Sequence, residues 1–172
     1  MRPGMTISGA LLGALLLAAG PAGAQSANAV LIDPAGEEIG NVALEQLARG
    51  VRIFAQAANL PPGVHGFHIH TTGQCEAPEF TSAGGHFNPT DEQHGWNNPQ
   101  GHHAGDLPNV HVQEDGVLAV EYFTDSVTLG EGETSIFDED GAAVVIHEDA
   151  DDYMSDPTGH AGARLACGVI ER

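Results

Sequence analysis

Short segments rich in apolar and β-branched residues recur along the chain, separated by stretches rich in Gly, Pro, Asn and Asp. Segments of this length and composition are typical of β-strands, and no stretch shows a convincing helical periodicity. We therefore predict several strands and no helix. The predicted strands cover residues 28–32, 41–47, 51–57, 64–70, 110–113, 117–123, 126–129, 142–147 and 165–170.

The connections between these segments differ in length. Asp115-Gly116 lies between two predicted strands and indicates a hairpin, because Asp-Gly supplies the positive φ angles of a tight primed turn. Two long connections, residues 71–109 and 148–163, contain no predicted strand. Long loops in a small all-β domain are usually functional or disordered. Both carry possible metal ligands and lie close to a cysteine, so we predict two ordered functional loops.

The first 24 residues have the pattern of a secretory signal peptide, with Arg2, an apolar run over residues 7–19 and Ala22-Gly23-Ala24 at the end. An uncleaved membrane anchor is the competing interpretation, but the apolar run is short for a bilayer span and no second hydrophobic stretch follows. We predict a leader over residues 1–24 and one exported domain over residues 25–172 without stable membrane association. That length suffices for one compact core.

Cysteine content and charge add two constraints. Cys75 and Cys167 are the two cysteines, and in an oxidising compartment one disulfide is favoured over two free thiols. The chain has 24 acidic residues, five arginines and no lysine, and its net charge of −19 argues against nucleic acid as a partner. The acidity fits either solubility in a salty medium or compositional drift, and it identifies no function.

Eight of the ten histidines fall between His65 and His111. One residue separates His68 from His70, so on an extended strand both project from the same face and can share one ion. The whole set of candidate ligands exceeds the needs of one four-coordinate ion: His68, His70, His86, His94, His103, Asp106 and His147. Imidazole suits copper and zinc, and a carboxylate is compatible with zinc, so two different metals are predicted.

Six short motifs, taken in order, resemble those of the copper/zinc superoxide dismutases. They are GFHIH (66–70), GHFNP (85–89), HG (94–95), HAGDL (103–107), HE (147–148) and GARLACGVI (162–170). Seven residues separate His86 from His94 and eight separate His94 from His103, and the resemblance covers nearly all of the chain after the leader. We predict an all-β fold, an eight-stranded flattened Greek-key β-barrel or sandwich with two long functional loops.

By this resemblance the ligands divide into two sets that share His86, which would bridge both ions as an imidazolate. The copper ligands would be His68, His70, His86 and His147, and the zinc ligands His86, His94, His103 and Asp106. Asp151 would link His68 to His94 and fix the orientation of both rings, and Arg164 would receive the anionic substrate. The implied activity is the disproportionation of superoxide to O₂ and H₂O₂ by copper cycling between Cu(II) and Cu(I), with structural zinc.

The remaining histidines are assigned structural or surface roles: His65, His102, His111 and His160. His103 is preferred over its neighbour His102 because its interval to Asp106 matches the family motif. Arg164 lies three residues before Cys167, which favours the active-site role over a simple ion pair with a carboxylate.

Several alternatives stay open at this point. A copper or zinc storage or delivery protein that kept the fold is the second hypothesis. A copper-only variant is the third, although His94, His103 and Asp106 argue against it.

Only four residues separate His70 from Cys75, a short loop typical of the bacterial periplasmic branch. We therefore predict a periplasmic or secreted enzyme that protects the cell envelope. A monomer and a homodimer are both compatible with the sequence.

Overall fold

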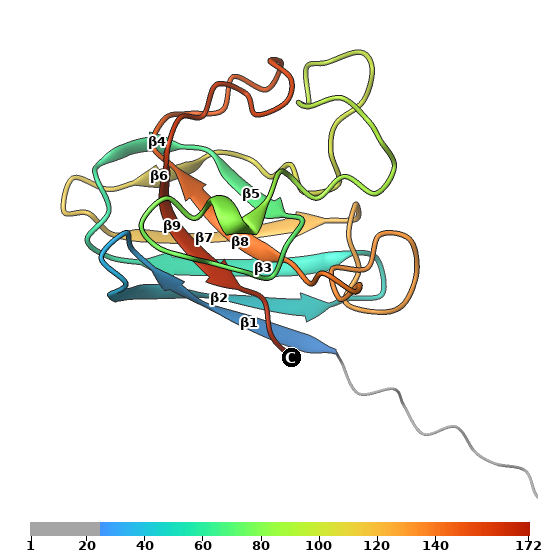
Figure 1. Cartoon of the computed structure of the whole chain (residues 1–172), viewed down its shortest axis with the longest axis horizontal. Helices are drawn as coiled ribbons and strands as arrows, with labels where there is room; N and C mark the ends of the chain where they lie inside the picture. The colour runs from blue at the N-terminus through green and yellow to red at the C-terminus, as the bar shows by residue number, and fades with distance from the viewer. Residues whose placement is uncertain (1–24) are drawn as a thin grey trace, which may run out of the picture.

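The computed structural model describes residues 25–172, and the predicted leader over residues 1–24 lies outside this part of the chain (Figure 1). Nine strands form the domain: β1 (Ser26–Ile32), β2 (Glu38–Gln46), β3 (Val51–Ala57), β4 (Gly63–His65), β5 (Phe67–His70), β6 (Val110–Val112), β7 (Leu118–Thr124), β8 (Ala143–His147) and β9 (Arg164–Val169). The helical content of residues 25–172 is one 3₁₀ turn, Thr81–Ala83. No helix in these residues is long and apolar enough to cross a membrane. The all-β prediction is confirmed.

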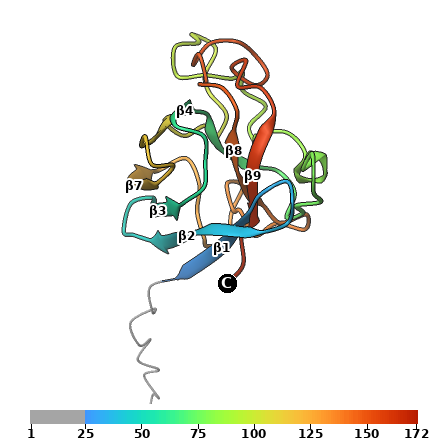
Figure 2. The ribbon, with the colours of Figure 1, turned by 90° about the vertical axis from the view of Figure 1, so that its left-hand side faces the viewer.

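The strands form an antiparallel sheet that curls around one core (Figure 2). Seven strands follow the order β5-β8-β9-β1-β2-β3-β7, and β4 and β6 form a separate pair. Because β4 runs directly into β5 and β6 leads into β7, this pair lies between the two ends of the larger sheet. The non-sequential neighbours, β3 beside β7 and β1 beside β9, agree with a Greek-key barrel.

Alternation along the strands builds the core. In β3, Val51, Ile53 and Ala55 are fully buried while the residues between them are exposed. In β5 and β8 every residue is buried, which means that something also covers the outer face of these two strands. Phe67 and Ile69 of β5 belong to the main core, so the outer positions of that strand are the intervening histidines.

The sequence-based prediction was wrong in three local details. The single strand expected over residues 64–70 is broken at Gly66, whose N–H donates to the Asp149 carbonyl at 2.8 Å, so that β4 and β5 enter different sheets. Residues 126–129 form no strand: Thr128 makes only an isolated bridge with Ser135, and the Leu129 N–H donates at 2.7 Å to the side chain of Gln46. In the Asp115-Gly116 turn only Gly116 has a positive φ (80°), so the turn is not the primed type.

The two long loops lie side by side at one end of the barrel (Figures 1 and 2). The Cys75–Cys167 disulfide, with an S–S distance of 2.00 Å, ties the first loop to β9. A second, smaller apolar cluster lies beneath this loop and contains Phe80, Ala83, Ala143, Val145 and Cys167. This cluster and the disulfide hold the loop against the outer face of β8 and β9, which is why that face is buried.

Candidate metal centre

Strands β5 and β8 bring three of the candidate ligands together. Because Phe67 and Ile69 face the core, His68 and His70 project from the outer face of β5, beneath the first long loop. β8 pairs with β5, and His147 follows the inward-facing Ile146 at the end of β8. The pairing of two strands therefore places imidazoles separated by more than 70 residues of sequence at one point.

Four buried imidazoles form the first cluster, the four-histidine group: His68, His70, His86 and His147. One nitrogen of each ring lies within 4.8 Å of the others, and the Nε2 atoms of His70 and His147 are 3.3 Å apart. Their Nδ1 atoms donate to carbonyls, that of His70 to Gly84 at 3.0 Å and that of His147 to Gly162 at 3.4 Å. In neutral rings both facing Nε2 atoms are then lone-pair donors, the arrangement that a metal cation requires.

Two further nitrogens of the four-histidine group, His68 Nδ1 and His86 Nε2, are buried and have no hydrogen-bond partner within residues 25–172. A buried polar atom without a partner costs roughly 1–3 kcal/mol, so both atoms indicate a site for a cation. Burial lowers the pKa of all four imidazoles, that of His86 to about 4 and that of His147 to about 3. The rings are therefore neutral at pH 7 and available to a metal ion.

A second cluster, the mixed group, combines three imidazoles with one carboxylate: His86, His94, His103 and Asp106. Asp106 Oδ1 lies 2.9 Å from His86 Nδ1 and 3.1 Å from His94 Nδ1. His103 Nδ1 is 3.4 Å from the same oxygen but makes no hydrogen bond. Burial alone would raise the pKa of Asp106, but the surrounding imidazoles lower it well below its usual range. Three nitrogens and one charged oxygen thus converge, a ligand set that fits tetrahedral zinc.

His86 belongs to both groups. Its Nδ1 faces Asp106 and its Nε2 is the unpartnered atom of the four-histidine group. An isolated β-bridge pairs its backbone with that of His70, and its ring centroid lies 3.9 Å from the ring of His68 and 5.1 Å from the ring of His94. One imidazole can therefore contact two ions, one through each nitrogen.

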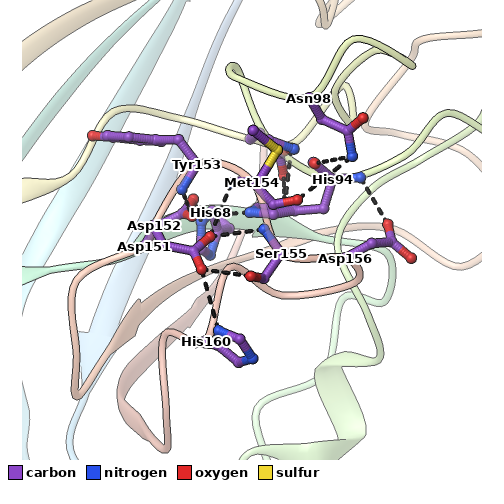
Figure 3. Close-up of polar contacts among 12 residues, drawn as sticks. His68, His94, Asn98, Asp151, Asp152, Tyr153, Met154, Ser155, Asp156 and His160 are labelled. Atoms are coloured by element: carbon purple, nitrogen blue, oxygen red, sulfur yellow. Dashed lines mark hydrogen bonds and ion pairs between the residues drawn. The ribbon is translucent and has the colours of Figure 1, made fainter.

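Asp151 connects the two groups from the other side. Its Oδ2 lies 2.9 Å from His68 Nε2 and its Oδ1 lies 2.9 Å from His94 Nε2. In both rings the bonded nitrogen is the one that faces away from the metal groups, so the carboxylate fixes the ring without competing for the ion. Burial opposes the charged form of Asp151, but the bonds to both histidines lower its pKa below the usual range. Figure 3 shows segment 151–156 around His94.

Gly159 is a functional residue that sequence reasoning missed. It has a φ of +63°, and a Cβ atom there would lie 1.9 Å from Asp151 Oδ1 and 2.6 Å from His94 Nε2. Any side chain would displace the carboxylate that joins the two groups. In the sequence Gly159 is one of several glycines in the second loop, and no local signal separates it from the others.

Arg164 lies beside the four-histidine group at the start of β9, in register with His147 of β8. Its guanidinium donates to the carbonyls of Phe80 and Gly84, and the Gly84 carbonyl also accepts from His70. No carboxylate of residues 25–172 lies within 4.0 Å of it, whereas Arg52 in β3 pairs with Glu45. The positive charge of Arg164 is thus uncompensated at short range, as an anion site requires.

The other four histidines lie outside both groups. His65 is buried, with its ring nitrogens bonded to the carbonyls of Pro61, His147 and Glu148. The ring of His102 stacks on Trp96 at a centroid distance of 3.8 Å and bonds the His103 carbonyl. His111 is exposed, and His160 bonds Asp152 on the surface, as Figure 3 shows. The structure thus brings together the seven candidate ligands and no other histidine.

Residues 38–170 match the family model for copper/zinc superoxide dismutase. The chain belongs to this family. Cu-Zn superoxide dismutase 1 of Aquifex aeolicus is 48% identical over 146 residues, which cover 84% of this chain and 86% of the relative. Cu-Zn superoxide dismutase 2 of the same organism is 47% identical over 167 residues, with 95% and 98% covered.

Solved structures of the family agree with the fold. A double mutant of a superoxide dismutase-like protein from Bacillus subtilis superposes with a TM-score of 0.80 at 46% identity, over 82% of this chain and 94% of that chain. Both of its substitutions introduce a histidine. The Greek-key β-barrel of the copper/zinc superoxide dismutase family is therefore the fold of this chain.

Proposed function

We propose that this member of the copper/zinc superoxide dismutase family disproportionates superoxide to O₂ and H₂O₂ with one copper and one zinc. The observation that carries the proposal is the position of His86, which presents one nitrogen to each of two adjoining ligand groups, with Nε2 buried and unpartnered. A single-metal protein has no need of a ligand shared in this way. The match of residues 38–170 to the family model supplies the independent support.

The donor atoms of the two groups favour different metals. The four-histidine group offers imidazoles alone, which suit copper in both of its oxidation states. The mixed group adds the carboxylate of Asp106 to three imidazoles, a set that suits zinc. Accordingly, His68, His70, His86 and His147 hold copper, and His86, His94, His103 and Asp106 hold zinc. All ligands come from one chain, so the proposal needs no second copy.

Copper, when bound, supplies reversible one-electron chemistry, so that one superoxide is oxidised to O₂ and a second is reduced. The residues of the chain do the rest. Arg164, which is only partly buried, provides the uncompensated positive charge that attracts the anion towards the four-histidine group. Reduction of the second superoxide consumes two protons, and His86 Nε2 can carry one of them while Nδ1 stays anchored by the mixed group. Asp151 keeps His68 and His94 in fixed orientations throughout.

Export to an oxidising compartment is part of the proposal. Cys75 and Cys167 form a disulfide, and such bonds persist in the bacterial periplasm or outside the cell and not in the reducing cytosol. In that location the enzyme would protect the cell envelope from superoxide. A periplasmic or secreted protein without stable membrane association accounts for these features together.

The test is superoxide disproportionation by the purified chain, with copper and zinc determined on the same sample. We expect high activity at one copper and one zinc per chain, and its loss in His86→Ala. The matched control is His111→Ala, which removes an exposed histidine outside both groups and leaves the rate unchanged. Full occupancy of both metals with negligible activity would favour the storage or delivery hypothesis, and full activity with copper but without zinc would favour the copper-only hypothesis.

A further inference from the structure

We infer that Asn109 is a positioning residue that sets the place of Asp151 and, through it, the zinc affinity of the mixed group. This inference rests on the proposed function for the identity of the metal. Asn109 is neither a metal ligand nor within the sequence motifs of the family resemblance, and it lies at the end of the first long loop, directly before β6.

The side chain of Asn109 makes a reciprocal pair of hydrogen bonds with the backbone of Asp151. The Asn109 amide donates through Nδ2 to the Asp151 carbonyl at 2.9 Å, and Asn109 Oδ1 accepts from the Asp151 N–H at 2.9 Å. Both backbone polar groups of Asp151 are therefore satisfied by one side chain. The carboxylate of Asp151 is joined to this backbone through Cβ alone. Its two oxygens lie 2.9 Å from His68 Nε2 and from His94 Nε2, so a shift of the backbone moves the carboxylate off both rings.

Asn109 itself is held in place by two tyrosines. Its N–H donates to Tyr153 Oη at 2.7 Å, and its carbonyl accepts from Tyr122 Oη at 2.6 Å. Tyr122 comes from β7 of the barrel, and Tyr153 comes from the second loop two residues after Asp151. The N–H of Tyr153 also donates to Asp151 Oδ1 at 2.7 Å. Asn109 thus connects strand β7 of the barrel to the loop that carries Asp151.

An amide is the chemistry that this position requires. The site needs one donor and one acceptor at the end of a short side chain, which asparagine supplies and aspartate does not, because a carboxylate only accepts. A carboxylate would also face the Asp151 carbonyl oxygen at close range. Next to Asp151, the Asp152 N–H donates to the Gly159 carbonyl of the same loop at 2.9 Å. The nearest backbone bonds to other segments of the chain are those from the Gly66 N–H to the Asp149 carbonyl and from the Asn97 N–H to the Tyr153 carbonyl, both at 2.8 Å. Neither fixes the Asp151 backbone.

The experiment measures zinc affinity in the folded protein by competition with a chelator, together with the visible absorption of Co²⁺ bound in the mixed group. Asn109→Ala is expected to lower zinc affinity roughly tenfold, the lower end of the range for residues that orient metal ligands, and to change the Co²⁺ spectrum. The matched control is Gln46→Ala. The Gln46 amide also ties a loop to the barrel, through bonds of 2.9 Å to Thr128 and 2.7 Å to Leu129, but far from the metal groups.

A double variant separates positioning from general destabilisation. If Asn109 acts through the carboxylate of Asp151, then adding Asn109→Ala to Asp151→Asn lowers zinc affinity no further, whereas independent effects add. Additive losses, or a zinc affinity of Asn109→Ala within twofold of the unaltered chain, would overturn the inference. Asn109→Asp, which keeps the acceptor and the shape, serves the same comparison where the alanine variant does not fold.

The same measurement distinguishes this inference from the proposed function. An unaltered chain that binds no zinc in the mixed group contradicts the proposed metal assignment. Zinc bound tightly and equally by the unaltered chain, Asn109→Ala and Gln46→Ala contradicts the role of Asn109 alone. Neither result depends on superoxide chemistry.

Discussion

The covered end of the curled sheet (β5 and β8) and the strands that follow towards its other end (β1 to β3, the open end) have the same antiparallel pairing but opposite surroundings. In β1 and β3, inward positions are buried and outward positions are exposed in strict alternation. In β5 and β8, every position is buried, because the long loops cover their outer face (Figure 1). The open end is thus an ordinary half-solvated sheet. At the covered end, the side chains that point outward from the sheet lie inside a metal centre.

The covered end is also held together differently. The open end relies on ladders of backbone hydrogen bonds and a continuous apolar core. Over β5 and β8 the loops have almost no regular structure, and one disulfide, a small apolar cluster and the hydrogen bonds of Asp106 and Asp151 hold them. The differences between the two ends can therefore be tested by perturbations that affect one end alone.

Lowering the pH is expected to give the largest difference between the two ends. Burial lowers the pKa of His86 to about 4 and that of His147 to about 3, so the unfolded chain binds more protons as the pH falls below about 6.5. The metal-free protein should lose stability on the order of 5 kcal/mol between pH 6.5 and pH 4. The open strands contain no histidine. Urea unfolding across this range checks the effect. The double variant His86→Asn with His147→Asn should lose less stability, while the lowered pKa values of His68 and His70 keep part of the acid dependence.

Above neutral pH, His94 makes the stability of the metal-free protein change with pH in the opposite direction. Burial disfavours its charged form, but the hydrogen bonds to Asp106 and Asp151 raise its pKa to about 9. Its contribution is complete below pH 6.5 and is lost as the pH rises towards 9. The metal-free protein should therefore be most stable near pH 6.5, and a stability that keeps rising between pH 7 and 9 would contradict this origin.

Removal of the disulfide, which lies at the covered end, should be nearly as costly. Cys75 and Cys167 are 92 residues apart, and closing a loop of that length contributes about 4 to 5 kcal/mol in the chain-entropy model. The double variant Cys75→Ser with Cys167→Ser should lose about that much in urea unfolding of the metal-free protein. Ala119→Ser, at an exposed position of β7, should change stability by no more than about 0.5 kcal/mol. A loss below about 1 kcal/mol in the disulfide variant would mean that the apolar cluster and the polar contacts hold the loop without the disulfide.

Two glycines sharpen the comparison at the level of single atoms. Gly159→Ala places a Cβ against Asp151 and His94, whereas a Cβ at Gly36 meets nothing within 4 Å, although both glycines have positive φ. Gly159→Ala should lower zinc affinity roughly 10- to 100-fold. Gly36→Ala should cost about 1 kcal/mol of stability and leave zinc affinity unchanged. Equal zinc affinities in the two variants, measured by chelator competition, would show that the loop adapts.

Two arginines provide the smallest contrast. Arg164→Gln should lower kcat/KM for superoxide by roughly tenfold, because its charge is the uncompensated one beside the four-histidine group. Arg52→Gln should leave kcat/KM unchanged, since Arg52 pairs with Glu45 on the open sheet. With a net charge of −19 and no lysine, the unaltered enzyme should lose little rate with added salt, or gain some. A steep decline with ionic strength would contradict that expectation.

The local patterns were sufficient for most of the fold. Eight of the nine segments predicted as strands from their apolar residues contain a strand in the structure. The period of two was enough to predict that His68 and His70 share one face of a strand. The segment 126–129 was misassigned because its alternating apolar residues Val127 and Leu129 are indeed buried. Its backbone forms only an isolated bridge, between Thr128 and Ser135, and the Leu129 N–H bonds the side chain of Gln46. Period alone does not distinguish these cases.

The sequence by itself determined the family, and the types and order of the candidate ligands. These depend on residue identity and spacing, which are written directly in the chain. Only the tertiary structure decided that Gly159 leaves room for Asp151, that the Gly84 carbonyl serves both His70 and Arg164, and that Asn109 holds the backbone of Asp151. The physical reason is that these contacts join residues up to 80 positions apart through backbone atoms, and every residue type has the same backbone atoms, so no local pattern reveals them.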